Sequence, residues 1–358
     1  MIFPCIPIQA RRHLFQKVDA DFLLLEQECM QKRHEQIRRQ PDALRLLVIR
    51  SGAIGDTIVM SVVYQALRRH FPSAYIEAIG PEERLQLINL PGLIDRITSI
   101  ERADIATLFS SAYSFPSALT AYVQQFNKIL VYSFDQVGVL MTNLQRIHPE
   151  GLLRFDPFPN NESNEHITHY LLNTLKALGI EEQERVMPQI AIAEKNSSAA
   201  KNEILKIAVH PGSGSLKKNW PVESFIDLCL RLVQAFSVRI HLVIGPAEQT
   251  LVREFTRKLS SASVLKLLVE LPLSELAHEL QNCALYIGND SGISHLAAAL
   301  DVPTIAIFST SNPAIWQPVG KDVLIFHDRS ASGGAKITVD PVYSAAVTYL
   351  SRQCKISN

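Results

Sequence analysis

Short apolar runs alternate with amphipathic segments along most of the chain. The run at 44–50 precedes a tight turn and an amphipathic helix that should end before Pro72. The same order of strand, turn and helix begins again near residue 205, after a stretch of small and polar residues at 193–203. Strands and helices that alternate in this way predict parallel sheets with helices on both faces. We therefore expect an α/β protein with two doubly wound, Rossmann-like domains.

Changes in composition divide the chain into four parts. Residues 1–42 are expected to form an N-terminal helical extension, because the stretch 17–40 lacks Gly and Pro. An N-terminal domain at 43–195 and a C-terminal domain at 196–340 should follow, and residues 341–358 should close the chain as a helix. Ligands of such sheets bind outside the carboxyl ends of the strands, so a site is expected in the cleft between the domains.

The extension allows two interpretations. It carries a loose apolar stripe among charges, which is typical of a helix on the protein surface. The alternative is an interfacial helix beside anionic lipid, because Arg33, Arg38 and Arg39 make its end basic.

Charge and cysteine content exclude several classes of protein. Among the 358 residues, 35 Lys and Arg balance 35 Asp and Glu, and such a chain lacks the long-range field of a dedicated nucleic-acid binder. The five cysteines include no Cys-x-x-Cys pair, which argues against a disulfide framework or a zinc ribbon. The sequence shows neither a secretory signal nor an apolar run of about 18 residues, so a cytoplasmic protein is expected.

The turn after the first predicted strand carries the first candidate chemistry. Gly52 and Gly55 allow a tight backbone there, and Asp56 stands where the helix opens. The spacing is not G-x-G-x-x-G, so it does not predict a dinucleotide fingerprint. Asp56 is either a cap or first-turn carboxylate favoured by the helix dipole, or a base that faces a cleft. Arg50, Gly52 and Gly55 are candidates for shaping the turn or contacting an acceptor.

Two turns in the second half carry further candidates. The turn at 210–221 combines glycines, hydroxyls and lysines, and Ser213 and Lys218 suit the binding of phosphate. Its alternative is a solvated loop. The turn at 245–248 ends at Glu248, which would accept hydrogen bonds from ribose hydroxyls or simply be a favourable first-turn residue.

The last candidate turn lies at 289–295. We expect Asp290 to be the N-cap of the following helix, with Ser291 and Gly292 in its first turn. Free amides at a helix start bind anions, so these amides should meet a diphosphate while Asp290 orders the turn or meets sugar hydroxyls. His295, one turn further on, is either a ligand contact or a core histidine.

Together these turns resemble glycosyltransferase family nine, the bacterial heptosyltransferases of lipopolysaccharide assembly. The resemblance rests on R-x-G-x-I-G-D at 50–56, K-x-W-P at 218–221 and G-P-x-E at 245–248. Its most specific part is N-D-S-G-I-S-H-L-A-A-A-L-D-V-P-T-I-A-I-F at 289–308. In order and spacing the resemblance covers 44–349.

The resemblance implies a GT-B fold, in which an N-terminal acceptor domain at 43–195 and a C-terminal donor-nucleotide domain at 196–340 face a central cleft. It also implies transfer with inversion from a nucleotide-activated sugar. The usual donor of the family is ADP-L-glycero-D-manno-heptose. Asp56 takes the position of the family's proposed general base. Lys218 and the turn at 290–295 would hold the diphosphate and sugar, and Glu248 would lie near the nucleoside. Ser213 completes the expected donor site.

The expected partners are a nucleotide-sugar donor and a lipid-linked or glycan acceptor, such as the lipopolysaccharide core. Such an acceptor would bring the protein to the cytoplasmic face of the inner membrane as a peripheral contact. No carboxylate cluster suited to Mg²⁺ follows a predicted strand, so transfer is expected to need neither metal nor cofactor. Residues 1–42 and 100–159 do not match the family's pattern.

Two functions of other classes stay open beside the transferase. One is a sugar-nucleotide epimerase or hydrolase on the same architecture. The other is a non-catalytic protein that binds a sugar nucleotide. Transfer or hydrolysis of ADP-, GDP- and UDP-sugars by the purified protein would separate the three.

Overall fold

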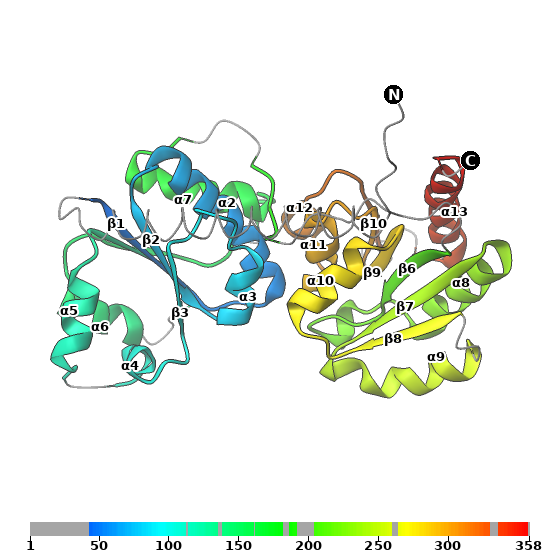
Figure 1. Ribbon diagram of the computed structural model, residues 1–358, viewed down its shortest axis with the longest axis horizontal. Coiled ribbons are helices and arrows are strands. Elements are labelled where there is room, and N and C mark those ends of the chain that lie inside the picture. The colour runs from blue at the N-terminus through cyan, green and yellow to red at the C-terminus, as the bar shows by residue number, and fades with distance from the viewer. Residues whose placement is uncertain are drawn as a thin grey trace, which may run out of the picture.

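Two α/β units, each built round a parallel sheet, lie side by side in the computed structural model (Figure 1). The structure describes residues 43–111, 114–134, 138–160, 162–181, 186–191, 204–259, 264–329 and 336–356. The extension expected at 1–42 and the polar stretch at 193–203 lie outside the described residues, so both stay predictions.

The first unit contains a five-stranded sheet in the order β3-β2-β1-β4-β5. All its strand pairings are parallel. The strands are β1 (Arg45–Arg50), β2 (Tyr75–Gly80), β3 (Arg96–Ser99), β4 (Lys128–Tyr132) and β5 (Leu152–Phe155). The order reverses between β1 and β4, which makes this the topological switch point of the sheet.

The second unit contains a six-stranded parallel sheet in the order β11-β10-β9-β6-β7-β8. Its strands are β6 (Leu205–His210), β7 (Val238–Ile244), β8 (Leu265–Val269), β9 (Leu285–Asn289), β10 (Thr304–Phe308) and β11 (Val323–His327). Its switch point lies between β6 and β9, so the two sheets have equivalent topologies.

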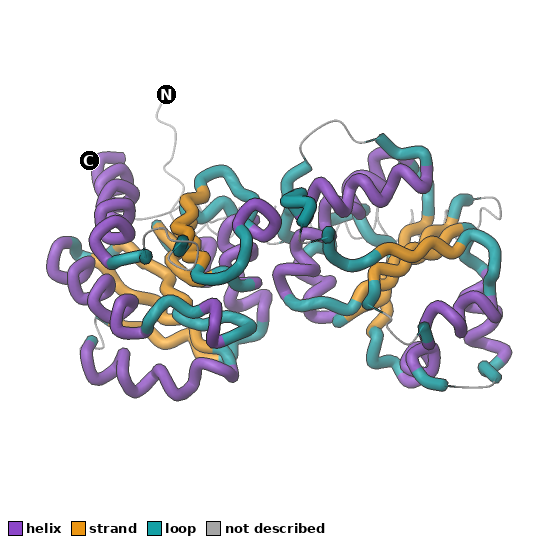
Figure 2. The backbone as a smooth tube through the Cα atoms, turned by 180° about the vertical axis from the view of Figure 1, so that it is seen from behind, coloured by secondary structure: helices purple, strands orange, loops and turns teal. Residues whose placement is uncertain are grey.

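Helices cover both faces of each sheet in Figures 1 and 2. The first unit holds α2 (Ile54–His70), α3 (Glu82–Leu87), α4 (Ala103–Ala106), α5 (Ser117–Gln124), α6 (Val139–Ile147) and α7 (Ile167–Thr174), with 3-10 helices η1 (Thr107–Phe109) and η2 (Leu175–Leu178). The second holds α8 (Val222–Ala235), α9 (Val252–Lys258), α10 (Leu273–Gln281), α11 (Gly292–Ala299), α12 (Pro313–Trp316) and α13 (Val339–Ile356), with η3 (Leu216–Lys218) and η4 (Pro246–Leu251).

Three apolar cores follow from the alternation of side chains along the strands. In β1, Leu46 and Val48 belong to a central core with α2, α3 and α7, whereas Leu47 and Ile49 face an outer core with α4, α5 and α6. The central core continues into the second unit through α10 and α11. The third core joins the other face of the second sheet to α8, α9 and α13.

The two units touch through the first turns of α2 and α11, which pack together. A Cβ atom added to Gly292 would lie only 2.8 Å from the backbone nitrogen of Gly55. Glycine at both positions therefore allows the two helix starts to meet. A hydrogen bond from the Leu273 amide to Glu83 Oε1, at 2.9 Å, joins α10 to α3 at the same junction.

The predicted α/β class with two doubly wound sheets is confirmed by these topologies. Strands β5, β8 and β11 were not predicted from the sequence, and β8 and β11 are half-exposed edge strands whose apolar pattern is incomplete.

Candidate active site

A cavity of about 740 Å³ lies at the carboxyl ends of β6, β7 and β8. The start of α2 closes it from the first unit through Ala53 and Ile54, so both units contribute to its walls. Its position beside the switch point of the second sheet is where doubly wound sheets bind ligands. The volume falls in the range of small-molecule and cofactor sites.

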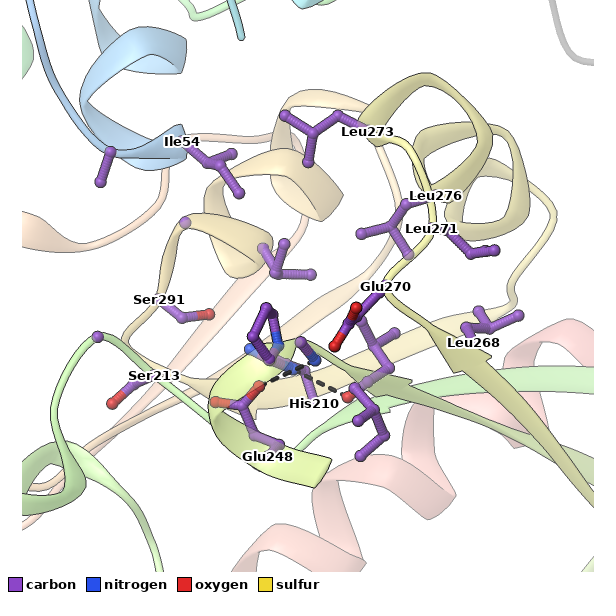
Figure 3. A pocket seen from close by; sticks show the side chains of 18 of the residues that line it. Ile54, His210, Ser213, Glu248, Leu268, Glu270, Leu271, Leu273, Leu276 and Ser291 are labelled. Carbon is purple, nitrogen blue, oxygen red and sulfur yellow. Dashed lines mark hydrogen bonds between the residues drawn. The ribbon is translucent and has the colours of Figure 1, made fainter. Parts of the chain in front are cut away.

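The cavity has an apolar wall and a polar wall (Figure 3). The leucines gather on the right of the view and two serines on the left, with Glu248 below and His210 near the centre. The apolar wall consists of Ile54, Leu268, Leu271, Leu273, Leu276 and Ile293. The polar wall consists of His210, Ser213, Glu248, Glu270 and Ser291. A ligand with one flat apolar end and one polar end fits such a division.

The Glu248 side chain is held in place on the cavity wall. Its side chain is 5% exposed, and Oε2 accepts a hydrogen bond of 2.9 Å from the Gly245 amide. A Cβ atom added to Gly212 would lie 2.1 Å from its carboxyl carbon. Glycine at 212 thus leaves the room that this carboxylate occupies on the cavity wall.

His210 ends β6 and is also buried. Its Nδ1 donates a hydrogen bond of 3.0 Å to the carbonyl of Val243 on the neighbouring strand. Burial lowers the pKa of His210, and the hydrogen bond to Val243 and the nearby Glu248 carboxylate oppose that shift only in part. A neutral His210 therefore borders the cavity at neutral pH.

The loop after β6 is anchored by Asn289, the buried last residue of β9. Asn289 Nδ2 donates to the carbonyl of Pro211 at 2.7 Å, and its Oδ1 accepts from the Trp220 amide at 2.9 Å. Within the loop, the Ser213 hydroxyl lies 2.7 Å from Asn219 Oδ1. This pinning holds Ser213 on the cavity wall and Lys218 beside β9.

Lys218 pairs with Asp290 across the switch point of the second sheet. Its Nζ lies 2.8 Å from Asp290 Oδ2, which also accepts a hydrogen bond from the Ser311 hydroxyl. The expectation that Asp290 is the N-cap of the following helix is wrong, because the N-cap of α11 is Ser291. Asp290 stands one residue earlier and directs its carboxylate to the lysine and the hydroxyl instead.

Asp56 occupies the third position of α2. Its Oδ2 accepts a hydrogen bond of 2.8 Å from the Ala53 amide, so it does serve the helix start as a first-turn carboxylate. Its Oδ1 lies 3.8 Å from Arg50 Nη2. The side chain of Asp56 stays 20% exposed, which leaves the carboxylate accessible at the cleft.

Arg50 is a buried cation at the end of β1. It is 6% exposed, and burial lowers its pKa. Nη1 contacts the sulfur of Met60 at 3.3 Å, whereas the buried Nε and Nη2 atoms have no hydrogen-bond partner. Asp56 is the nearby carboxylate that favours its charge. Two unsatisfied donors of a buried guanidinium are costly, and such costs cluster at functional sites.

His295 lies where the candidate residues of both units meet. It is 7% exposed, and burial lowers its pKa to about 4. The negative charges of Asp290 and Asp56 raise the pKa of His295 and so oppose the effect of burial. His166 and Lys218 lower this pKa further. A Cβ atom added to Gly55 would lie 3.2 Å from its ring. The structure therefore brings Asp56, Lys218 and Asp290 around one neutral histidine.

The residues predicted from the sequence fall into two groups. Four of them line the cavity: Ser213, Glu248, Ser291 and Gly292. The others surround the junction of α2 and α11 beside it: Arg50, Gly52, Gly55, Asp56, Lys218, Asp290 and His295.

Sequence reasoning missed most of the apolar wall and two charged residues that line the cavity. Arg84 lines the cavity and donates a hydrogen bond to the carbonyl of Gly52, and Glu270 projects into the cavity from the end of β8. The apolar residues at 271–276 follow strand β8, which was not predicted from the sequence. A residue on the loop after a strand can be assigned to a cavity wall only once that strand is placed, so the Leu271-Pro272 sequence was not recognised as a signal.

The part of the chain that the structure describes shows neither a metal-binding cluster nor a membrane-spanning helix. There, no group of three or more His, Cys, Asp or Glu residues is arranged to hold a metal ion. Among the same residues, no helix combines the length and apolar character that crossing a bilayer requires.

Two equivalent doubly wound sheets that face one cavity define the GT-B class of fold. The model of the family described as "Glycosyltransferase family 9 (heptosyltransferase)" matches residues 157–337. The chain belongs to this family and is a glycosyltransferase.

Individual proteins show the same relationship. A Campylobacter coli lipopolysaccharide heptosyltransferase 1 is 23% identical over 303 residues, which cover 75% of this chain and 84% of that protein. A Haemophilus influenzae protein named as a glycosyltransferase is 29% identical over 116 residues, and this match spans 32% of the chain and 34% of that relative's length.

A solved structure shares the fold. The structure of E. coli ADP-heptose lipopolysaccharide heptosyltransferase II has a TM-score of 0.68 at 17% identity. The alignment covers 87% of this chain and 99% of that protein. At this level of identity the likeness shows the fold alone.

Proposed function

We propose that this protein transfers heptose from ADP-heptose, with inversion, to the lipopolysaccharide core or a related glycan, and that Asp56 is the general base. One observation carries the proposal. The start of α2 contributes Ala53 and Ile54 to the wall of the cavity at the second sheet. Asp56 follows in the same turn, and its Oδ2 accepts the hydrogen bond of the helix start while its Oδ1 does not take part in that bond. A carboxylate from one unit thus stands beside a ligand cavity in the other.

The cavity suits the nucleoside of the donor. A base would lie against the leucines and Ile293 of the apolar wall, and ribose hydroxyls would donate to Glu248. The proposal that the donor sugar is heptose rests on a relative's name, since the E. coli protein of the same fold is named for ADP-heptose.

The diphosphate would meet Lys218 and the start of α11. The first amides of a helix have no partners inside it, and the helix dipole favours an anion there. Ser291 and Gly292 place those amides on the cavity wall. Lys218, already held by Asp290, adds a cation whose charge stabilises the departing diphosphate.

In the proposed transfer step, each bond that forms is matched by a bond that breaks. The acceptor hydroxyl oxygen forms a bond to the anomeric carbon as the bond from that carbon to the diphosphate oxygen breaks. The hydroxyl proton passes to Asp56, and the electron pair of the broken bond leaves with ADP. Attack from the side opposite the diphosphate inverts the configuration of the sugar.

The relatives' names support the proposed acceptor. Both the Campylobacter and the E. coli proteins are named lipopolysaccharide heptosyltransferases. A lipid-linked core acceptor would be met at the cytoplasmic face of the inner membrane, with the protein in peripheral contact.

The decisive experiment incubates the purified protein with ADP-, GDP- and UDP-sugars, with and without deacylated oligosaccharide from heptose-deficient lipopolysaccharide. Transfer from ADP-heptose alone, with an inverted anomeric configuration by NMR, is the expected result. Epimerised or hydrolysed donor without transfer would favour the epimerase or hydrolase, and tight binding without turnover would favour the non-catalytic binder.

A further inference from the structure

An exposed aromatic side chain stands at the switch point of the first sheet. Phe134 follows β4 by two residues and is 58% exposed, whereas most large apolar side chains of this unit are buried. Strand β4 pairs with β1 so that Tyr132 lies beside Arg50. Phe134 therefore lies level with the turn that leads to Asp56, at the edge where such sheets bind ligands.

Phe134 is backed by a row of aromatic rings. Its ring centroid lies 5.3 Å from that of Phe158, which in turn lies 5.1 Å from Trp316 of the second unit. The guanidinium carbon of Arg50 lies 5.6 Å from the ring of Phe158. Phe158 thus connects the exposed ring to the arginine beside the proposed base.

The chemistry of this surface suits a sugar ring. The face of an aromatic ring is electron-rich and attracts the weakly positive C–H groups of a flat ligand face. A sugar has such C–H faces, while its hydroxyls project from the rim and stay free to reach a carboxylate. An alkyl chain offers no hydroxyl to Asp56. A carbohydrate could therefore use both the ring of Phe134 and the carboxylate of Asp56, whereas a lipid tail could use only the ring.

We propose that Phe134, supported by Phe158, is the platform on which a sugar ring of the acceptor lies while its hydroxyl faces Asp56. The inference rests on the proposed transfer reaction. It adds a contact residue for the sugar ring to the domain that is expected to bind the acceptor.

The test compares Phe134→Ala with Phe134→Tyr and with Phe109→Ala. Phe109 is a matched control, because it is 38% exposed and lies on η1, in the connection that follows the edge strand β3. With the deacylated oligosaccharide as acceptor, Phe134→Ala should raise the acceptor KM about five- to tenfold and leave the donor KM unchanged. Phe134→Tyr keeps the ring and should stay within about twofold of the unaltered protein, as should Phe109→Ala.

A direct binding measurement separates this proposal from the reaction itself. Calorimetric titration of the same oligosaccharide is carried out on the unaltered protein and on Phe134→Ala. Transfer with an unchanged acceptor KM in Phe134→Ala would overturn the platform and leave the reaction standing. Binding that is lost in Phe134→Ala, without transfer by the unaltered protein, would keep the platform and overturn the reaction. Neither binding nor transfer by the unaltered protein would overturn both.

Discussion

The carboxyl edges of the two sheets have the same topology but offer different surfaces. At the second edge, hydrogen bonds fix two groups beside the cavity: the Gly245 amide holds Glu248, and Asn289 holds the loop after β6. At the first edge, Asp56 is partly exposed and Phe134 mostly so.

This difference indicates that the two halves of the fold bind different kinds of ligand. A walled cavity with fixed polar groups selects one kind of ligand, because mismatched groups would leave buried atoms unpaired. An open edge with an aromatic ring tolerates variation in what it binds. The donor side is therefore expected to be sensitive to small changes in its walls, and the acceptor side to depend on a few exposed groups.

The largest effect should come from Asp56→Asn at the first edge. Asparagine keeps an oxygen for the Ala53 amide, so the start of α2 and the melting temperature should survive. Transfer should fall by about 10²-fold or more, the scale of losing a general base, with nucleotide affinity retained. Turnover, a thermal melt and a nucleotide titration are measured together.

Near-normal turnover in Asp56→Asn would return this residue to a purely structural role. If the variant melts much lower, Asp56→Glu replaces it as the test. It keeps the charge and displaces it by about one methylene, so transfer should fall without loss of the fold.

At the second edge, Lys218→Ala should weaken donor turnover by about 1.5–3 kcal/mol, the worth of a hydrogen bond to a charged group. The change also leaves Asp290 with the Ser311 hydroxyl but without its cation. Lys217→Ala is the control, because the neighbouring lysine is exposed. Donor kcat/KM of both variants is compared, and equal values would contradict the role given to Lys218.

Two glycines of the same loop test how closely the donor cavity is walled. Alanine at Gly212 would place its Cβ against the Glu248 carboxyl, whereas alanine at Gly214 would meet nothing within 4 Å. Gly212→Ala should raise the donor KM by about tenfold or lower the stability by about 1–3 kcal/mol. Gly214→Ala should do neither. Equal behaviour of the two variants would show that the wall at Glu248 is not tight.

The junction between the edges should be sensitive to acid. Burial lowers the pKa of His295 to about 4, below the ordinary value of about 6.5, so the unfolded chain binds more protons than the folded one between these values. The free energy of unfolding should therefore fall as the pH drops from about 6.5 to 4, by about 2–3 kcal/mol for this histidine.

Urea unfolding at several pH values measures this loss. His295→Gln should flatten the dependence on pH, and His278→Gln, at an exposed histidine, should leave it as in the unaltered protein. The same slope in His295→Gln as in the unaltered protein would show that the junction does not resist protonation.

Chelation should have the smallest effect. Lys218 and the amides at the start of α11 supply the positive charge for the leaving diphosphate in the proposed reaction, so EDTA should leave transfer nearly intact. Complete loss of activity that Mg²⁺ or Mn²⁺ restores would mean that the donor edge handles the diphosphate in another way. The proposed contrast between the edges would then need a metal on the donor side.

The local parts of this protein can be predicted from its amino-acid sequence alone. The apolar strands, the glycine-containing turns after them and the carboxylates Asp56 and Glu248 in the following first turns are all set by neighbours within a few residues. Such patterns can be predicted because backbone freedom and helix starts are local properties. The family resemblance then joined these turns into one expected site; the family is confirmed, and the roles of the site residues stay predictions.

Which of these parts meet depends on how the sheets and helices pack. Asp290 was expected to cap a helix, yet it binds Lys218, which lies 72 residues earlier in the chain. The leucine wall after β8 and the contact of Arg50 with the ring of Phe158 depend on strand order and on the contact between the two units. Contacts of this kind carry no local signature, because any apolar or charged residue at a strand end is locally acceptable. Packing of the sheets and the glycine contact between α2 and α11 bring these groups together.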